Sequence, residues 1–195
     1  MNLRQVLTAP NQLTLLRMIF VPFIIIYLVK EDFRWSLLLF VLAGLSDGLD
    51  GLLARKLHQQ TLLGQYLDPI ADKLLLSTMF LVLSIEQRAL VPWKFTVLVF
   101  SRDVSILVFS GVLFMIAGLR DFRPSIFGKA NTVAQIAAIF FALLFLVKPI
   151  VAVHIAVKVF LRATFFFTIL SAVHYAFLVQ HRLREHGHVP PLQKR

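Results

Sequence analysis

Six long apolar runs divide this sequence of 195 residues and limit the folds that it can adopt. A helix of about twenty apolar residues spans the hydrocarbon core of a bilayer, and most of these runs approach or exceed that length. Only helices and closed barrels satisfy their backbone groups in lipid, and these runs lack the alternation of barrel strands. The sequence therefore predicts an all-α integral membrane protein, a bundle of six transmembrane helices. Their expected bounds are Leu13–Val29, Trp35–Leu53, Leu67–Ile85, Val91–Gly118, Thr132–Val147 and Val151–Leu178.

The distribution of lysine and arginine between the short loops predicts the orientation of the bundle. The positive-inside rule places the more basic set of loops in the cytoplasm, so both termini are expected there. Residues 1–180 are expected to form one membrane domain, followed by a polar, basic C-terminal tail at 181–195. The more basic set contains Arg4, Arg55, Lys56, Arg120, Arg123, Lys129, Arg182, Arg184, Lys194 and Arg195.

The net charge is +10, from 20 basic and 10 acidic residues. In a membrane protein this excess fits cytoplasmic loops that meet anionic lipid headgroups, so we expect membrane lipids and not nucleic acid as the partners. The sequence contains no cysteine, which excludes disulfides and thiol chemistry.

Half of the acidic residues lie within the apolar runs or at their ends. A charged side chain inside a membrane helix costs at least ~2.5 kcal/mol, and neighbouring carboxylates also repel one another. Bound cations are the natural compensation for such a cluster. The five residues are Asp47, Asp50, Asp68, Asp72 and Asp103.

Four of these acids and three small residues repeat at helical spacing on either side of a short basic connection. Two antiparallel helices joined there would bring the four carboxylates face to face near the cytoplasmic surface. Oxygen ligands favour Mg²⁺ or Mn²⁺ over Zn²⁺, and four carboxylates are enough for two ions that clamp a phosphate. One stripe contains Asp47, Asp50, Gly51 and Ala54, and the other contains Gly64, Asp68 and Asp72.

The glycines near these acids have two different expected roles. Gly51 and Gly64 leave room beside the carboxylates for a bulky ligand. Gly44 forms a G-x-x-x-G pair with Gly48, and this pattern is typical of close helix packing in membranes.

The complete pattern is Asp47-x2-Asp50-Gly51-x2-Ala54-Arg55-x8-Gly64-x3-Asp68-x3-Asp72. It resembles, at every fixed position, the signature of the CDP-alcohol phosphatidyltransferases, and the six-span layout agrees with that family. The resemblance implies metal ligation by Asp47, Asp50 and Asp68, and a general base at Asp72 that also touches a metal. It implies a cytidine diphosphate site at Gly51, Ala54, Arg55 and Gly64.

The resemblance also implies an enzyme that uses CDP-diacylglycerol, depends on divalent cations, releases CMP and forms a homodimer. We expect the protein to cross the bacterial inner (cytoplasmic) membrane several times, with its active site facing the cytoplasm.

The acceptor alcohol is less sharply indicated. The segments Pro10–Arg17 and Leu67–Lys73 resemble the branch that makes phosphatidylglycerol phosphate and cardiolipin. Within that branch, Ser101–Val104 and Lys129–Thr132 are closer to the cardiolipin synthases. Glycerol 3-phosphate is the acceptor that we expect, because its enzyme is the commoner member, and phosphatidylglycerol is the alternative.

Both acceptors are anionic, so cationic side chains inside the bundle are expected to bind them. Arg102 and Lys129 are the favoured candidates, and Arg17 is placed to serve the donor or the acceptor. Each has a simpler alternative role: Arg102 can pair with Asp103, and Lys129 can anchor its helix at the interface. Lys73 is a fourth cationic candidate for binding the acceptor. Its simpler alternative role is to neutralise the charge of the neighbouring acids.

Other classes of protein also place acids in membrane helices. A divalent-cation transporter is the main alternative, but here no acid continues a path to the opposite face. An intramembrane phosphatase or protease and an inactive scaffold are further alternatives. The Gly51–Arg55 arrangement argues against the phosphatase or protease, and the intact set of four aspartates argues against the inactive scaffold.

Overall fold

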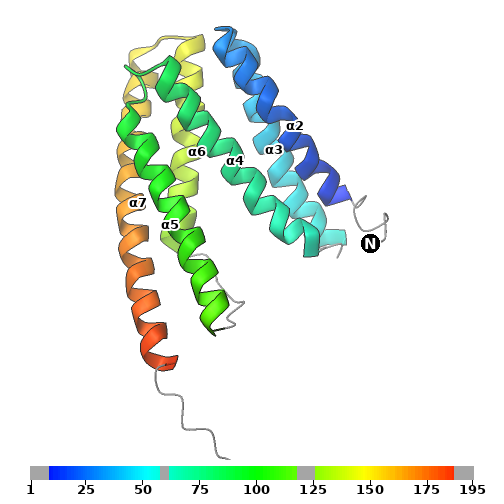
Figure 1. The fold of residues 1–195 in the computed structure, drawn as a ribbon. Helices are drawn as coiled ribbons and strands as arrows, with labels where there is room; N and C mark the ends of the chain where they lie inside the picture. Colours follow the sequence, from blue (N-terminus) through cyan, green and yellow to red (C-terminus); the bar gives the residue numbers. More distant parts are fainter. Residues whose placement is uncertain (1–8, 58–61, 118–125, 187–195) are drawn as a thin grey trace, which may run out of the picture.

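The computed structural model describes residues 9–57, 62–117 and 126–186, and it describes side chains for 16–46, 71–105 and 126–174. Every element within these ranges is an α-helix, and none is a strand. The helices are α2 (Ala9–Val29), α3 (Phe33–Leu57), α4 (Leu62–Glu86), α5 (Trp93–Ala117), α6 (Ile126–Val147) and α7 (Val151–His186) (Figure 1).

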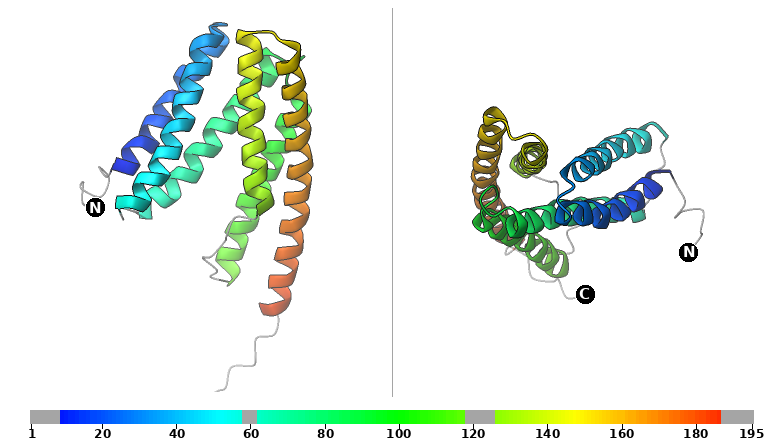
Figure 2. Two further views of the ribbon diagram at one scale, coloured as in Figure 1. Left: turned by 180° about the vertical axis from the view of Figure 1, so that it is seen from behind. Right: turned by 90° about the horizontal axis from the view of Figure 1, so that it is seen from above.

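Successive helices alternate in direction, so the bundle runs up and down between two ends (Figure 1). Helix α2 packs against α3 and α4, while α7 packs against α5 and α6. Helix α4 crosses between the two groups and contacts α5 and α6. Both views in Figure 2 show the two groups side by side, and they spread apart towards the end where α3 finishes and α4 begins. This end is called the motif end below, and the other is called the outer end.

The connections at the outer end follow from local backbone chemistry. Helix α2 ends in a Schellman motif, in which the Asp32 amide donates to the Tyr27 carbonyl at 2.9 Å and Glu31 takes a φ of 60°. Pro92 and Pro149 lie in the next two outer connections, where the missing amide hydrogen does not break a helix.

An apolar core joins all six helices, and α5 contributes Phe95, which packs against it near the outer end. Met79, Phe80 and Leu83 of α4 are almost completely buried against residues of α2, α6 and α7. Large apolar side chains also cover the outside of the bundle, including Ile85, Val133 and Phe166, which are each more than 60% exposed. An apolar exterior of this kind suits contact with lipid.

The all-helical prediction and its six helices are confirmed for the described residues. The helices begin and end at somewhat different residues from those expected: the first begins at Ala9, the fifth begins at Ile126, and the sixth continues to His186. Residues 187–195 of the predicted tail lie outside the described part, so the division at residue 180 stays a prediction.

Two of the described helices are long and apolar enough to cross a membrane, namely Ile126–Val147 and Val151–His174. The segments Leu16–Val29 and Phe33–Ser46 are shorter apolar helices. Six crossings and the cytoplasmic position of both termini therefore stay predictions.

Candidate functional site

Both stripes of the predicted motif lie on helices that meet at the motif end. The last turns of α3 contain Asp47 and Asp50, and the first turns of α4 contain Asp68 and Asp72. Asp72 is the one residue of the signature whose side chain lies in the described part. The side chains outside that part are those of Asp47, Asp50, Gly51, Ala54, Arg55, Gly64 and Asp68.

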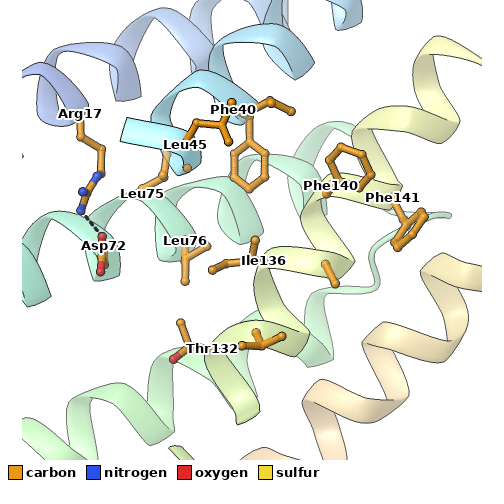
Figure 3. Close-up of a pocket in the computed structure, with 14 residues that line it drawn as sticks. Arg17, Phe40, Leu45, Asp72, Leu75, Leu76, Thr132, Ile136, Phe140 and Phe141 are labelled. Atoms are coloured by element: carbon orange, nitrogen blue, oxygen red, sulfur yellow. Dashed lines mark hydrogen bonds and ion pairs between the residues drawn. The ribbon is translucent and has the colours of Figure 1, made fainter. Parts of the chain in front are cut away.

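Asp72 forms an ion pair with Arg17 of α2 (Figure 3). The arginine is 1% exposed, whereas the Asp72 side chain is 39% exposed. A buried guanidinium requires a paired anion, so this contact fixes the orientation of the carboxylate on its helix. Sequence reasoning had named both residues, but it had not predicted that they contact each other.

An apolar pocket of about 570 Å³ begins at this ion pair. Its walls come from α2, α3, α4 and α6, and Phe140 and Phe141 lie at the far end from Asp72 (Figure 3). The remaining lining is almost entirely apolar, with Leu75 and Ile136 on facing helices. A cavity with charge at one end and apolar walls along its length matches an amphipathic molecule that carries a polar head and an alkyl chain.

Gly44 lines this pocket, and a Cβ built there would meet no atom within 4 Å. The predicted role in close helix packing is therefore not found within the described part of this chain. The glycine instead widens the pocket on its α3 wall.

A second group of charged side chains joins α4, α5 and α7 near the Arg17–Asp72 ion pair. The Asp103 carboxylate accepts from the Lys73 ammonium and, at 2.7 Å, from Arg102 Nη1. The other terminal nitrogen of Arg102 donates to Ser171 Oγ at 3.0 Å. Arg102 thus makes the ion pair with Asp103 that had been its alternative role, and both side chains are about nine-tenths buried.

The remaining acceptor candidate, Lys129, is exposed in the first turn of α6, beside the buried Gly128. The structure therefore brings Arg17 to Asp72 and Arg102 to Asp103, and it leaves Lys129 at the surface of the motif end.

The sequence of the chain matches the sequence model of the CDP-alcohol phosphatidyltransferase family over residues 7–179. The chain belongs to this family. The prediction made from the eight fixed positions of the signature is confirmed at the level of the family, and so is the prediction of an enzyme.

Relatives of this phosphatidyltransferase carry two kinds of name. The CDP-diacylglycerol–glycerol-3-phosphate 3-phosphatidyltransferase of Aquifex aeolicus is 38% identical over 129 residues, which cover 65% of this chain and 70% of that protein. A Bacillus subtilis protein of the same name is 32% identical and is covered over 73% of its length. The human cardiolipin synthase (CMP-forming) is 40% identical over 101 residues, which span 51% of this chain and only 33% of that protein.

Members of this family generally depend on divalent metal ions. Among the residues whose side chains are described, no three His, Asp or Glu residues gather to hold an ion. Three of the four signature aspartates lie outside those residues. The donor set itself fits a hard cation, because it consists only of carboxylates and one of them, Asp72, is partly exposed at the mouth of the pocket.

Sequence reasoning missed a polar seam between α6 and α7 of the phosphatidyltransferase. Thr168 Oγ1 donates to Asn131 Oδ1 at 3.1 Å, and Ser171 lies one turn further along α7. Gln135 follows Asn131 by four residues on α6, and both are buried. Polar residues at this spacing in otherwise apolar helices were the available signal.

Proposed function

We propose that the protein transfers the phosphatidyl group of CDP-diacylglycerol to glycerol 3-phosphate and releases CMP. The observation that carries this choice is the extent of the likeness within the family. The two relatives named for glycerol 3-phosphate are covered over 70% and 73% of their lengths. The cardiolipin synthases of human and Streptomyces coelicolor are covered over 33% and 53%.

The signature residues divide the work at the motif end in this proposal. Asp47, Asp50, Asp68 and Asp72 hold two Mg²⁺ or Mn²⁺ ions, which when bound offset the charge of the diphosphate. The cytidine diphosphate lies against Gly51, Ala54, Arg55 and Gly64. The helical spacing of the signature residues along α3 and α4 supports these roles, as does the small size of the two glycines.

Asp72 acts as the general base. The acceptor hydroxyl gives its proton to the Asp72 carboxylate as its oxygen bonds to the phosphorus that carries the diacylglycerol. The bond from that phosphorus to the CMP oxygen breaks, and CMP leaves with the electron pair. Arg17 supports this role because its ion pair fixes the orientation of the carboxylate.

The apolar pocket supplies a place for part of the lipid donor. Its charged end lies at Asp72, where the reaction takes place, and its apolar walls run away from that point towards Phe140 (Figure 3). One alkyl chain along these walls would hold the diphosphate beside the base.

The acceptor-binding residues predicted from the sequence are Arg17, Arg102 and Lys129. Arg17 and Arg102 are buried and already ion-paired, so they orient the carboxylates of Asp72 and Asp103 in this proposal. Lys129 is exposed and is the one of the three that is proposed to contact the acceptor directly.

The proposed setting is a bacterial inner membrane crossed by all six helices, with the motif end in the cytoplasm. Aromatic residues at the outer end support the orientation of the bundle across a bilayer. Trp35 and Trp93 are 52% and 61% exposed there, and Tyr27 stacks on Trp35 with ring centroids 6.2 Å apart. Tryptophan and tyrosine are enriched where a membrane meets water. A homodimer also remains part of the proposal.

Cardiolipin synthesis, with phosphatidylglycerol as the acceptor, is the second candidate. The 40% identity with the human cardiolipin synthase favours it, as does the sequence Ser101-Arg102-Asp103. A divalent-cation transporter is no longer supported, because the family match covers most of the chain.

The test is CMP release by the purified protein with CDP-diacylglycerol and Mg²⁺ or Mn²⁺. Glycerol 3-phosphate and phosphatidylglycerol are offered in separate reactions, and a reaction without CDP-diacylglycerol is the control. Release with glycerol 3-phosphate supports the proposal, and release with phosphatidylglycerol alone makes the protein a cardiolipin synthase. No release with either acceptor overturns both candidates.

A further inference from the structure

Four polar side chains form a continuous chain from the interior of the bundle to the site. It begins at Ser171 on α7, continues through Arg102 and Asp103 on α5, and ends at Lys73 on α4. The exposure rises along this chain, from 0% at Ser171 to 37% for the Lys73 side chain. The ammonium is therefore the part of this network that a polar ligand can reach.

The charges of the network do not cancel. Arg102 and Lys73 share the single carboxylate of Asp103, which leaves one positive charge over these three residues. The neighbouring Asp72 is paired with Arg17. A buried guanidinium with two fixed partners cannot turn towards a ligand without losing them, whereas an ammonium has three donors and Asp103 accepts from it through one oxygen.

We propose that Lys73 binds the phosphate of the anionic acceptor and that Asp103, Arg102 and Ser171 position its ammonium. This inference rests on the proposed function and adds a residue to its acceptor site. Lys73 follows Asp72 directly on α4, and the two side chains lie about 100° apart around the helix, towards α5 and α2 respectively. An acceptor whose phosphate lies at the ammonium therefore spans the space between the two side chains to bring its hydroxyl to the proposed base. The same argument holds for glycerol 3-phosphate and for phosphatidylglycerol, since both present a phosphate oxygen.

The position of Asp103 explains why the Lys73 ammonium lies towards α5 and not beside the Arg17–Asp72 ion pair. The carboxylate of Asp103 belongs to α5 and draws the ammonium across from α4. Arg102 holds that carboxylate from the side facing α7, and Ser171 holds Arg102. Asp103 is thus a positioning residue that links the helix of the base to the rest of the bundle.

The experiment measures KM for the acceptor and for CDP-diacylglycerol separately in Lys73→Gln, using the acceptor that the wild-type protein accepts. We expect the acceptor KM to rise about tenfold or more, the size of losing a hydrogen bond between charged groups, while the CDP-diacylglycerol KM stays unchanged. Lys73→Arg keeps the charge and should recover most of the loss. Lys158→Gln removes an exposed lysine from α7 and serves as the matched control with wild-type constants.

A second pair of variants tests the positioning role without touching Lys73. Ser171→Ala removes the hydroxyl that holds Arg102 and should raise the acceptor KM about threefold, as expected for a weaker, indirect contact. Thr168→Val removes an equally buried hydroxyl one turn away, which contacts Asn131 and not Arg102, so its acceptor KM should not change. This pair decides the question if Lys73→Gln fails to fold.

The outcomes separate this inference from the proposed function. A wild-type protein that releases CMP, with an unchanged acceptor KM in Lys73→Gln, overturns the role of Lys73 and leaves the function standing. A rise in the CDP-diacylglycerol KM instead would assign Lys73 to neutralisation of the acids. A wild-type protein that releases no CMP and binds neither acceptor in calorimetry overturns both.

Discussion

The two ends of the bundle bury very different side chains. At the outer end, the buried polar groups are small and satisfied: Ser36 donates to the Ile24 carbonyl at 3.2 Å, and Thr96 donates to that of Phe80 at 3.0 Å. At the motif end, the buried polar groups include long, charged side chains: Arg17 is ion-paired with Asp72, and Arg102 is ion-paired with Asp103. His154 Nδ1 near the outer end is the exception to this division.

This difference indicates that buried charges lower the stability of the motif end, where the reaction is proposed to take place. A buried charge in a membrane helix is expensive even when it is paired, and the apolar packing of the outer end would be the cheaper solution throughout. The ion pairs are kept at one end, around the signature residues, because a reaction between anions requires fixed charges there. Substitutions at the two ends should therefore affect different measurements.

The largest effect is expected for Asp72→Asn. Loss of the general base should lower kcat for CMP release by about 10²- to 10⁴-fold, the usual contribution of such a group. Binding of CDP-diacylglycerol, measured by calorimetry, should remain largely intact because the other signature residues are unchanged. Near-normal turnover would exclude Asp72 as the base and would remove the main functional distinction between the two ends.

Asp103→Asn should affect both kinds of measurement. The substitution leaves Lys73 and Arg102 without their shared anion, so the free energy of unfolding should fall by about 4 kcal/mol. The acceptor KM should rise in the same variant. Thermal unfolding in detergent measures the change in stability, and steady-state kinetics measure the change in KM. Wild-type stability in this variant would show that the ion pairs of Asp103 do not stabilise the fold.

Met79→Ala tests the outer half of α4, where the side chain is completely buried in the apolar core. The cavity should lower the free energy of unfolding by about 3 kcal/mol, as large-to-small core substitutions usually do. Neither KM should change at a temperature where the variant remains folded. A selective rise in the acceptor KM would contradict the separation of the two ends.

Gly44→Leu has the smallest expected effect, and it tests the pocket that extends between the ends. A Cβ at this position meets no atom within 4 Å and the pocket lies beside it, so stability should stay close to that of the wild type. The pocket becomes shorter, and KM for CDP-diacylglycerol should rise about tenfold, because one or two methylene groups of the alkyl chain lose their place. The acceptor KM is the internal control, and an unchanged donor KM would remove the pocket from the donor site.

The sequence by itself determined the helices, the family and the location of the signature. These features are local: the apolar runs set the helix lengths, and the four aspartates fall on two consecutive helices joined by a short connection. The partners of the charged residues could not be predicted in this way. Arg17 and Asp72 are separated by 55 residues, Lys73 and Asp103 by 30, and Arg102 and Ser171 by 69.

Only the tertiary structure decided which of several cations each acid contacts. Any of the basic residues at the motif end could have balanced Asp72 or Asp103 on grounds of charge alone. The crossing of α4 between the two helix groups made the choice, because it places Asp72 beside α2 and Lys73 beside α5. Helical spacing fixes the direction of side chains on one helix, whereas helix packing fixes what those side chains meet.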